Sequence, residues 1–227
     1  TGYSDVDALV ILKDEVFMDS KRLIRAGKVL TNACRHMYRY DPLQHHGWFA
    51  IAQQDLDCFP EELLPVESLQ DARVLLGSNK LIIRLRQSDP ISFKSKALRH
   101  ITKIEGQLTA GWRPSNLYQL KSILSEFMLL PVLLMQTVTG KGCSKRDSFE
   151  WARQQFNATE WAIMEEVSKM REDWEYRPGF LSEWVLTRPG YAFRKIRRRW
   201  PSRIPPKISS RLTDEFYLKM AAFTASC

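Results

Sequence analysis

The first 85 residues alternate between short apolar segments and one long amphipathic segment. Residues 6–12 (VDALVIL) and 47–52 (GWFAIA) are short and rich in β-branched or aromatic residues, as buried strands are. Between them, over residues 23–37, apolar residues recur at three- and four-residue steps, after a capping Asp19 or Ser20. The pattern therefore predicts a strand, a helix and a second strand.

Two weaker elements are predicted before residue 88. Residues 67–76 have a short helical pattern that ends at Gly77, and residues 80–85 (KLIIRL) form a third apolar segment with strand character. Strand and helix in strict alternation are typical of a small α/β unit.

From Ser88 onward the pattern predicts helices only. Pro90 follows a Ser-Asp cap and suits the first position of a helix, and residues 114–138 form a long apolar helix with a bend at Pro131. Further helix boundaries are marked by Gly140, Ser144 and Asn157. Short connections between these helices favour an antiparallel bundle.

These elements predict an α+β protein with three parts. Residues 1–87 form a small mixed sheet with helices, residues 88–176 form an all-α helical bundle, and residues 177–227 form a basic C-terminal extension.

Composition narrows the class of protein. Hydrophobic residues make up 44% and charged residues 26% of 227 residues, which suits a globular protein with a sizeable core. The longest apolar run, residues 127–135, is interrupted by Pro131 and is much shorter than the roughly 20 residues of a membrane span. Four widely separated cysteines, without a CxxC motif, favour reduced thiols and a cytoplasmic location. We therefore expect neither a membrane segment nor a disulfide framework.

The candidate chemistry lies at the start of the chain, in Gly2-Tyr3-Ser4-Asp5-Val6-Asp7. On an extended backbone the carboxylates of Asp5 and Asp7 point to the same side and repel each other unless a cation lies between them. Mg²⁺ prefers a few carboxylates together with phosphate oxygens and water. A DxD motif by itself is also common as a turn, but here it follows Gly and Ser and opens a predicted strand.

Residues 1–12 (TGYSDVDALVIL) resemble the signature of the DNA polymerase β-like nucleotidyltransferase superfamily, of the kanamycin and minimal nucleotidyltransferase kind. The order of a catalytic domain followed by a helical bundle extends the resemblance loosely to residue 176. It implies that Asp5 and Asp7 bind Mg²⁺ or Mn²⁺ and that Gly2 and Ser4 face the nucleotide. The family's Gly-Ser pair would lie upstream of Thr1, so the chain is expected to be truncated at its N-terminus.

The same resemblance implies an activity: transfer of a nucleoside monophosphate from an NTP, such as ATP, to an acceptor hydroxyl, with release of pyrophosphate. It also implies a third carboxylate on a neighbouring strand, which aligns a metal or acts as a general base. Asp57 and Asp41 are equal candidates for this role, and His46 comes next, as a phosphate contact or base. A turn or a strand end explains Asp41 and Asp57 at least as well, and a structural hydrogen bond explains His46 better.

Basic residues offer a second kind of site. A cluster of cations near the C-terminus is interleaved with aromatic residues; it comprises Arg194, Lys195, Arg197, Arg198 and Arg199. This cluster could contact nucleic-acid phosphates, or it could be a solvated face of the protein. Cations on the first predicted bundle helix are candidates to meet a triphosphate: Lys94, Lys96, Arg99, His100 and Lys103.

Two classes of function therefore stay open. The first is a nucleotidyltransferase whose acceptor is a small molecule, a protein or RNA. The second is a catalytically inactive relic that acts as an interaction protein, in the manner of a toxin or antitoxin, or as a nucleic-acid-binding protein.

Overall fold

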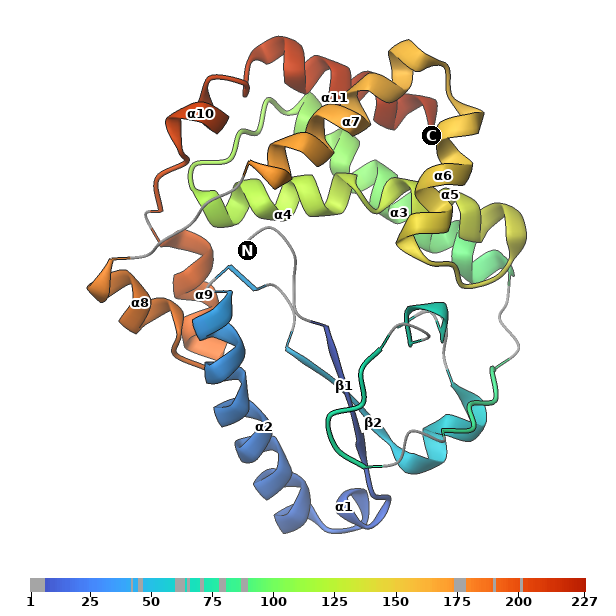
Figure 1. The fold of residues 1–227 in the computed structure, drawn as a ribbon, viewed down its shortest axis with the longest axis vertical. Coiled ribbons are helices and arrows are strands. Elements are labelled where there is room, and N and C mark those ends of the chain that lie inside the picture. Colours follow the sequence, from blue (N-terminus) through green and yellow to red (C-terminus); the bar gives the residue numbers. More distant parts are fainter. Residues whose placement is uncertain are drawn as a thin grey trace. The chain divides into compact units, whose positions relative to one another are not determined.

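The computed structural model describes residues 7–41, 43–44, 47–59, 64, 66–69, 72–77, 81–86, 90–173, 179–189, 191–200 and 202–227 (Figure 1). Within these residues the fold is α+β with helices as its bulk: eleven helices and a two-stranded parallel sheet near the N-terminus. The predicted order, with the strands first and helices after them, is confirmed at this level.

The sheet consists of β1 (Ala8–Leu12) and β2 (Trp48–Ala52). The strands are parallel, with Ala8 opposite Trp48 and Leu12 opposite Ala52. Parallel strands need a long crossover connection, and α1 (Glu15–Met18) and α2 (Ser20–Tyr40) lie within it. Both predicted strands and the predicted helix are thus confirmed, and the two strands begin at the same edge of the sheet.

Local signals fix the position of α2. The side chain of Asp19 accepts a hydrogen bond from the backbone N–H of Lys21 at 2.8 Å, which caps the first turn. In the middle of the helix, Trp48 Nε1 donates to the carbonyl oxygen of Leu30 at 2.8 Å and ties the helix to β2. The helix ends where the backbone of Asp41 becomes extended.

The predicted helix over residues 67–76 is present only at its start, as the short 3-10 helix η2 (Val66–Leu69), and residues 72–76 are not helical. A second 3-10 helix, η1 (Gln53–Cys58), follows β2. The predicted third strand over residues 80–85 is wrong within residues 81–85, where only Leu85 forms a bridge, with Phe59. Leu76 is 96% exposed and Ile82 is 77% exposed. An apolar pattern stabilises a helix or strand only when its apolar face is buried, and here it is not.

The predicted long apolar helix is two helices, α4 (Leu117–Phe127) and α5 (Leu130–Thr139). Pro131 lies in the first turn of α5, where its missing N–H would have no helical partner in any case. Proline therefore starts a new helix here and does not bend a continuous one. Gly140 ends α5 with φ of +66°, a conformation that glycine adopts without strain.

By length and composition alone, the stretch Leu117–Thr139 is apolar enough to cross a membrane, a test that the interior helices of globular proteins also pass. In this structure Leu117, Leu124 and Phe127 have no exposed surface. The stretch also contains Lys121, whose ammonium group is buried against a carboxylate. Both features are typical of an interior helix.

The remaining helices are α3 (Pro90–Thr109), α6 (Lys145–Gln155), α7 (Ala158–Glu172), α8 (Phe180–Leu186), α9 (Tyr191–Arg199), α10 (Pro206–Ser209) and α11 (Asp214–Ser226). The predicted helix starts at Ser144 and Asn157 are confirmed by their hydrogen bonds. Ser144 Oγ accepts from the N–H of Asp147 at 3.0 Å, and Asn157 and Glu160 cap each other reciprocally.

Contacts divide the chain into two compact units whose segments alternate along the sequence. Unit 1 consists of residues 1–53, 114–124 and 168–212, and unit 2 consists of residues 54–113, 125–167 and 213–227. The predicted domain boundaries, 87/88 and 176/177, fall on residues outside those described.

In unit 1, α8 packs against α9, and Trp200 Nε1 donates to Ser182 Oγ at 3.0 Å. Asp173 is ion-paired with a later stretch of this unit, with its oxygens 2.7 Å from Lys207 Nζ and 3.1 Å from Arg211 Nη1. The hydrogen bond from Lys207, helped by both positive charges, lowers the pKa of Asp173. The end of α7 is therefore tied to residues 207–211 within unit 1.

The interior of unit 2 is built around aromatic rings from four helices and a loop. The ring centroid of Phe223 lies 4.7 Å from that of Phe156, 5.5 Å from that of Phe127 and 6.1 Å from that of Trp161. Phe149 packs edge-on against Trp161, with 4.7 Å between the ring centroids. Helix α11 thus completes this interior from the end of the chain.

Candidate functional site

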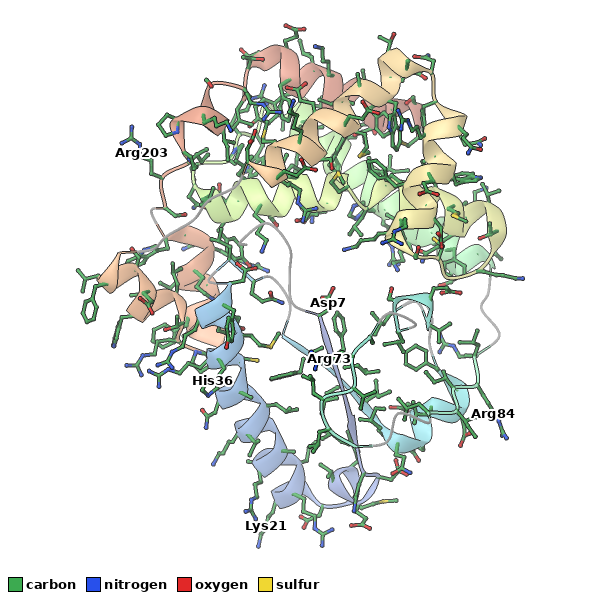
Figure 2. The ribbon with its side chains drawn as sticks, in the orientation of Figure 1. Asp7, Lys21, His36, Arg73, Arg84 and Arg203 are labelled. Atoms are coloured by element: carbon green, nitrogen blue, oxygen red, sulfur yellow. The ribbon has the colours of Figure 1, made fainter. Side chains whose placement is uncertain are left out.

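Asp7 lies immediately before β1, at the edge where both strands begin (Figure 2). Its side chain is exposed and forms no ion pair with any other residue that the structure describes. Gly2, Ser4, Asp5 and His46 lie outside the described residues, so their predicted roles stay predictions. An exposed carboxylate without a protein cation beside it is chemically suited to bind a metal ion.

Asp41 has a different environment, because it is buried and ion-paired. Lys121 Nζ, from α4, donates to Asp41 Oδ2 at 2.6 Å, and the N–H of Leu43 donates to Asp41 Oδ1 at 2.9 Å. The two charged side chains are 3% and 1% exposed. Its charge is therefore balanced by lysine, and both carboxylate oxygens already hold protein donors. This geometry makes Asp41 an anchor between α2 and α4 more readily than a metal ligand.

Asp57, the other candidate third carboxylate, is exposed on η1 in unit 2. Its Oδ1 atom lies 3.8 Å from Arg84 Nη1, and both side chains are more than 70% exposed. An ion pair of this kind contributes little to stability. Asp57 belongs to unit 2 and Asp7 to unit 1, so the role of Asp57 as a third carboxylate stays a prediction.

The basic cluster on α9 is divided by the geometry of the helix. Since each residue turns the helix by about 100°, Arg197 lies on the side opposite Lys195, Arg198 and Arg199. The latter three are exposed, whereas Arg197 is only 3% exposed. Its guanidinium carbon lies 3.6 Å from the ring centroid of Tyr38 in α2. Arg197 therefore packs α9 onto α2 and is not available at the surface; the side chain of Arg194 is outside the described part.

The buried guanidinium of Arg197 is incompletely satisfied, because its Nε and Nη1 atoms have no hydrogen-bond partner. Cys34 lies near the same pair of side chains. Burial raises the pKa of the Cys34 thiol, although hydrogen bonds from Trp48 and Tyr38 and the charge of Arg197 oppose the rise. The thiol therefore stays protonated at neutral pH. All four cysteines are free thiols in this structure.

The candidate cations of α3 lie in unit 2, and several contact protein groups. Lys103 Nζ lies 2.7 Å from Glu126 Oε1, His100 Nε2 donates to the carbonyl oxygen of Glu126 at 2.8 Å, and Arg99 Nε donates to the carbonyl oxygen of Ser95 at 3.3 Å. Lys94 is exposed. A role for these cations at a triphosphate stays a prediction.

No group of three or more His, Cys, Asp and Glu side chains with metal-binding geometry is present within the described ranges. The Asp5–Asp7 pair is outside this test because Asp5 is not described.

Sequence reasoning missed two features of unit 1. The first is Lys121, whose pairing with Asp41 depends on a contact across 80 residues of sequence. The second is a line of exposed cations along α2, comprising Lys21, Arg25, Lys28, Arg35 and Arg39. Their steps of three, four and seven residues follow one face of a helix, so this signal was present in the sequence.

Comparisons of this chain with protein-family models, with curated proteins and with solved structures find no match.

Proposed function

We propose that this chain is part of a nucleotidyltransferase of the DNA polymerase β-like kind, which transfers a nucleoside monophosphate from an NTP to an acceptor hydroxyl and releases pyrophosphate. The observation that supports this most directly is the placement of the DxD motif. Asp7 is an exposed carboxylate at the edge where β1 enters a parallel sheet, and the Ser-Asp-x-Asp pattern continues directly into that strand.

In this proposal Asp5 and Asp7 hold Mg²⁺ or Mn²⁺. Bound there, the ion would neutralise triphosphate charge and stabilise the attacking and leaving oxygens. Gly2 and Ser4 precede the carboxylates and would let the backbone approach the nucleotide phosphates closely. Asp41 would act indirectly, because its ion pair with Lys121 fixes the end of α2 before the chain enters β2.

The proposal is tested by measuring how a fluorescent NTP analogue binds in the presence of Mg²⁺, Mn²⁺ or a chelator. We expect metal-dependent binding that the double substitution Asp5→Asn and Asp7→Asn abolishes, since two neutral amides hold a divalent ion poorly. The matched control replaces two other aspartates, Asp19→Asn and Asp147→Asn. Asparagine caps a helix as well as aspartate does, which preserves the cap at position 19, and Asp147 gives only its backbone N–H to the Ser144 cap, so this control should fold and bind normally.

Two results would count against the proposal. Unchanged metal-dependent binding in the Asp5/Asp7 double variant would place the site elsewhere. No NTP binding by the unmodified chain, in a sample shown to be folded by circular dichroism, would favour the non-catalytic alternative.

A further inference from the structure

A line of positive charge runs along the exposed side of α2. Five cations of this helix lie within an arc of about 80° and extend over about 27 Å, at 1.5 Å per residue. They are Lys21, Arg25, Lys28, Arg35 and Arg39, with Asn32 in the one gap, and all six side chains are exposed. Lys21 and His36, labelled near the two ends of α2 in Figure 2, point away from the strands.

No cation of this line is paired with an acid in the part of the chain that the structure describes. Helix α2 itself contains no Asp or Glu. Arg22 lies off the line and does have acidic neighbours, since it approaches Glu15 and Asp19 at 3.4 and 3.7 Å. Unbalanced like charges in a row repel one another and raise the local potential, which favours a partner with several negative charges.

Helix α9 brings further cations next to α2 in unit 1. It contacts α2 through Arg197 over Tyr38, and it also has no acidic residue. Its opposite side exposes Lys195, Arg198 and Arg199. Two helices in contact therefore both present cations and no acids. We call the five α2 cations and these three residues the α2–α9 surface.

We propose that the α2–α9 surface binds the phosphodiester backbone of a nucleic-acid strand. A narrow line of cations matches a chain of phosphates, in which each strand places one charge about every 3.4 Å along a duplex. A helix that lies on an anionic membrane would instead place large apolar residues on its inserted side. Within the 80° arc of the line, the only side chains are the five cations and Asn32, so no apolar side chain lies in it.

This inference goes beyond the proposed transferase activity and does not depend on it. The test measures fluorescence anisotropy of labelled single-stranded RNA, and of DNA of the same mixed sequence, with the full chain at increasing salt. If the five α2 cations each neutralise one phosphate, the plot of log affinity against log salt has a slope of about −3.5, so a fourfold rise in salt weakens binding about 100-fold.

Substitution then locates the surface. The triple variant Lys21→Gln, Arg25→Gln and Lys28→Gln should make that slope shallower by about 2, because three phosphate contacts are lost. The control variant is Lys141→Gln, Lys145→Gln and Arg146→Gln. It also removes two lysines and one arginine, but from exposed positions in unit 2. It should leave the slope unchanged.

Every outcome decides the inference. Equal binding of RNA and DNA supports it and indicates recognition of the backbone, whereas preference for one of them supports it and identifies the natural partner. An equal loss in both triple variants, or no nucleic-acid binding, overturns it. Binding to phosphatidylserine vesicles in place of nucleic acid also overturns it. The Asp5→Asn and Asp7→Asn variant should bind nucleic acid normally, so failure of the proposed transferase site leaves this result intact.

Discussion

The centre of unit 1 holds ionised side chains, whereas the centre of unit 2 holds aromatic rings. In unit 1, Asp41 and Lys121 are 2.6 Å apart with almost no exposed surface, and the buried Arg197 packs on Tyr38. In unit 2, Phe223 joins Phe127, Phe156 and Trp161.

The two interiors should differ in how well they tolerate amino-acid substitutions. A buried ion pair is energetically close to an apolar pair of the same size, but the loss of one partner leaves an uncompensated charge. Aromatic packing buries no charge, and a hydrophobic substitution of similar volume costs little. The interior of unit 1 should therefore be sensitive to single changes and that of unit 2 more tolerant of them.

The largest effect is expected for Lys121→Met. It leaves the Asp41 carboxylate buried without its cation, and the free energy of unfolding should fall by about 3–5 kcal/mol, measured by chemical denaturation. The double variant Asp41→Asn and Lys121→Met keeps an acceptor for the Leu43 N–H and removes both charges, so much of the loss should be recovered. A double variant as unstable as the single one would show that the ion pair itself holds α2 and α4 together.

A smaller effect is expected for Tyr38→Leu. A desolvated cation–π contact contributes about 2 kcal/mol, and thermal unfolding should show a loss of that size. Tyr38→Phe keeps the ring under Arg197 and should cost about 1 kcal/mol or less, for the lost hydroxyl. Equal losses in the two variants would assign the effect to the hydroxyl and not to the ring.

In unit 2, Phe223→Leu should cost about 1.5 kcal/mol or less, because leucine keeps most of the apolar volume and loses only the ring-specific contacts. Chemical denaturation under the conditions used for Lys121→Met gives the direct comparison. A loss as large as that of Lys121→Met would remove the proposed difference between the two interiors.

The smallest effect at neutral pH is expected from Tyr217 of unit 2. Burial, together with the charge of Asp214, raises the pKa of Tyr217 from 10 to about 12, against the opposing charge of Arg113. The unfolded chain releases this proton near pH 10 while the folded chain keeps it, so stability should fall as the pH rises from 10 to about 12.

Unfolding followed by tyrosinate absorbance across this range measures that fall, and Tyr217→Phe should lessen it. Burial also raises the pKa of Cys227 to about 12, so part of the fall should persist in this variant. An unaltered profile in Tyr217→Phe would contradict the assignment.

Local signals in the sequence predicted the elements that depend on neighbouring residues. Helix α2, the two strands, the caps at Ser144 and Asn157 and the end at Gly140 each depend on a few adjacent positions. The predicted strand over residues 80–85 failed because a strand needs a partner, and only Leu85 has one among the described residues of that segment.

The candidate site was less predictable, for a related reason. The residues near Asp41 in the sequence do not indicate its ion pair with Lys121. A carboxylate available to a metal ion could therefore not be distinguished from one that is paired with a lysine. Arg197 is the opposite case. The wheel of α9 separates it from Arg198 and Arg199, and that separation can be read from the sequence once the helix is assigned.

The alternation of the two units along the chain has a consequence for biosynthesis. Unit 1 needs residues 168–212 and unit 2 needs residues 213–227, so neither unit is complete when the first half of the chain leaves the ribosome. Phe223, which joins the aromatic interior of unit 2, lies in the last of that unit's segments and emerges after the others. The early segments therefore keep their apolar surfaces exposed, and accessible to chaperones, until residues 168–227 have been translated.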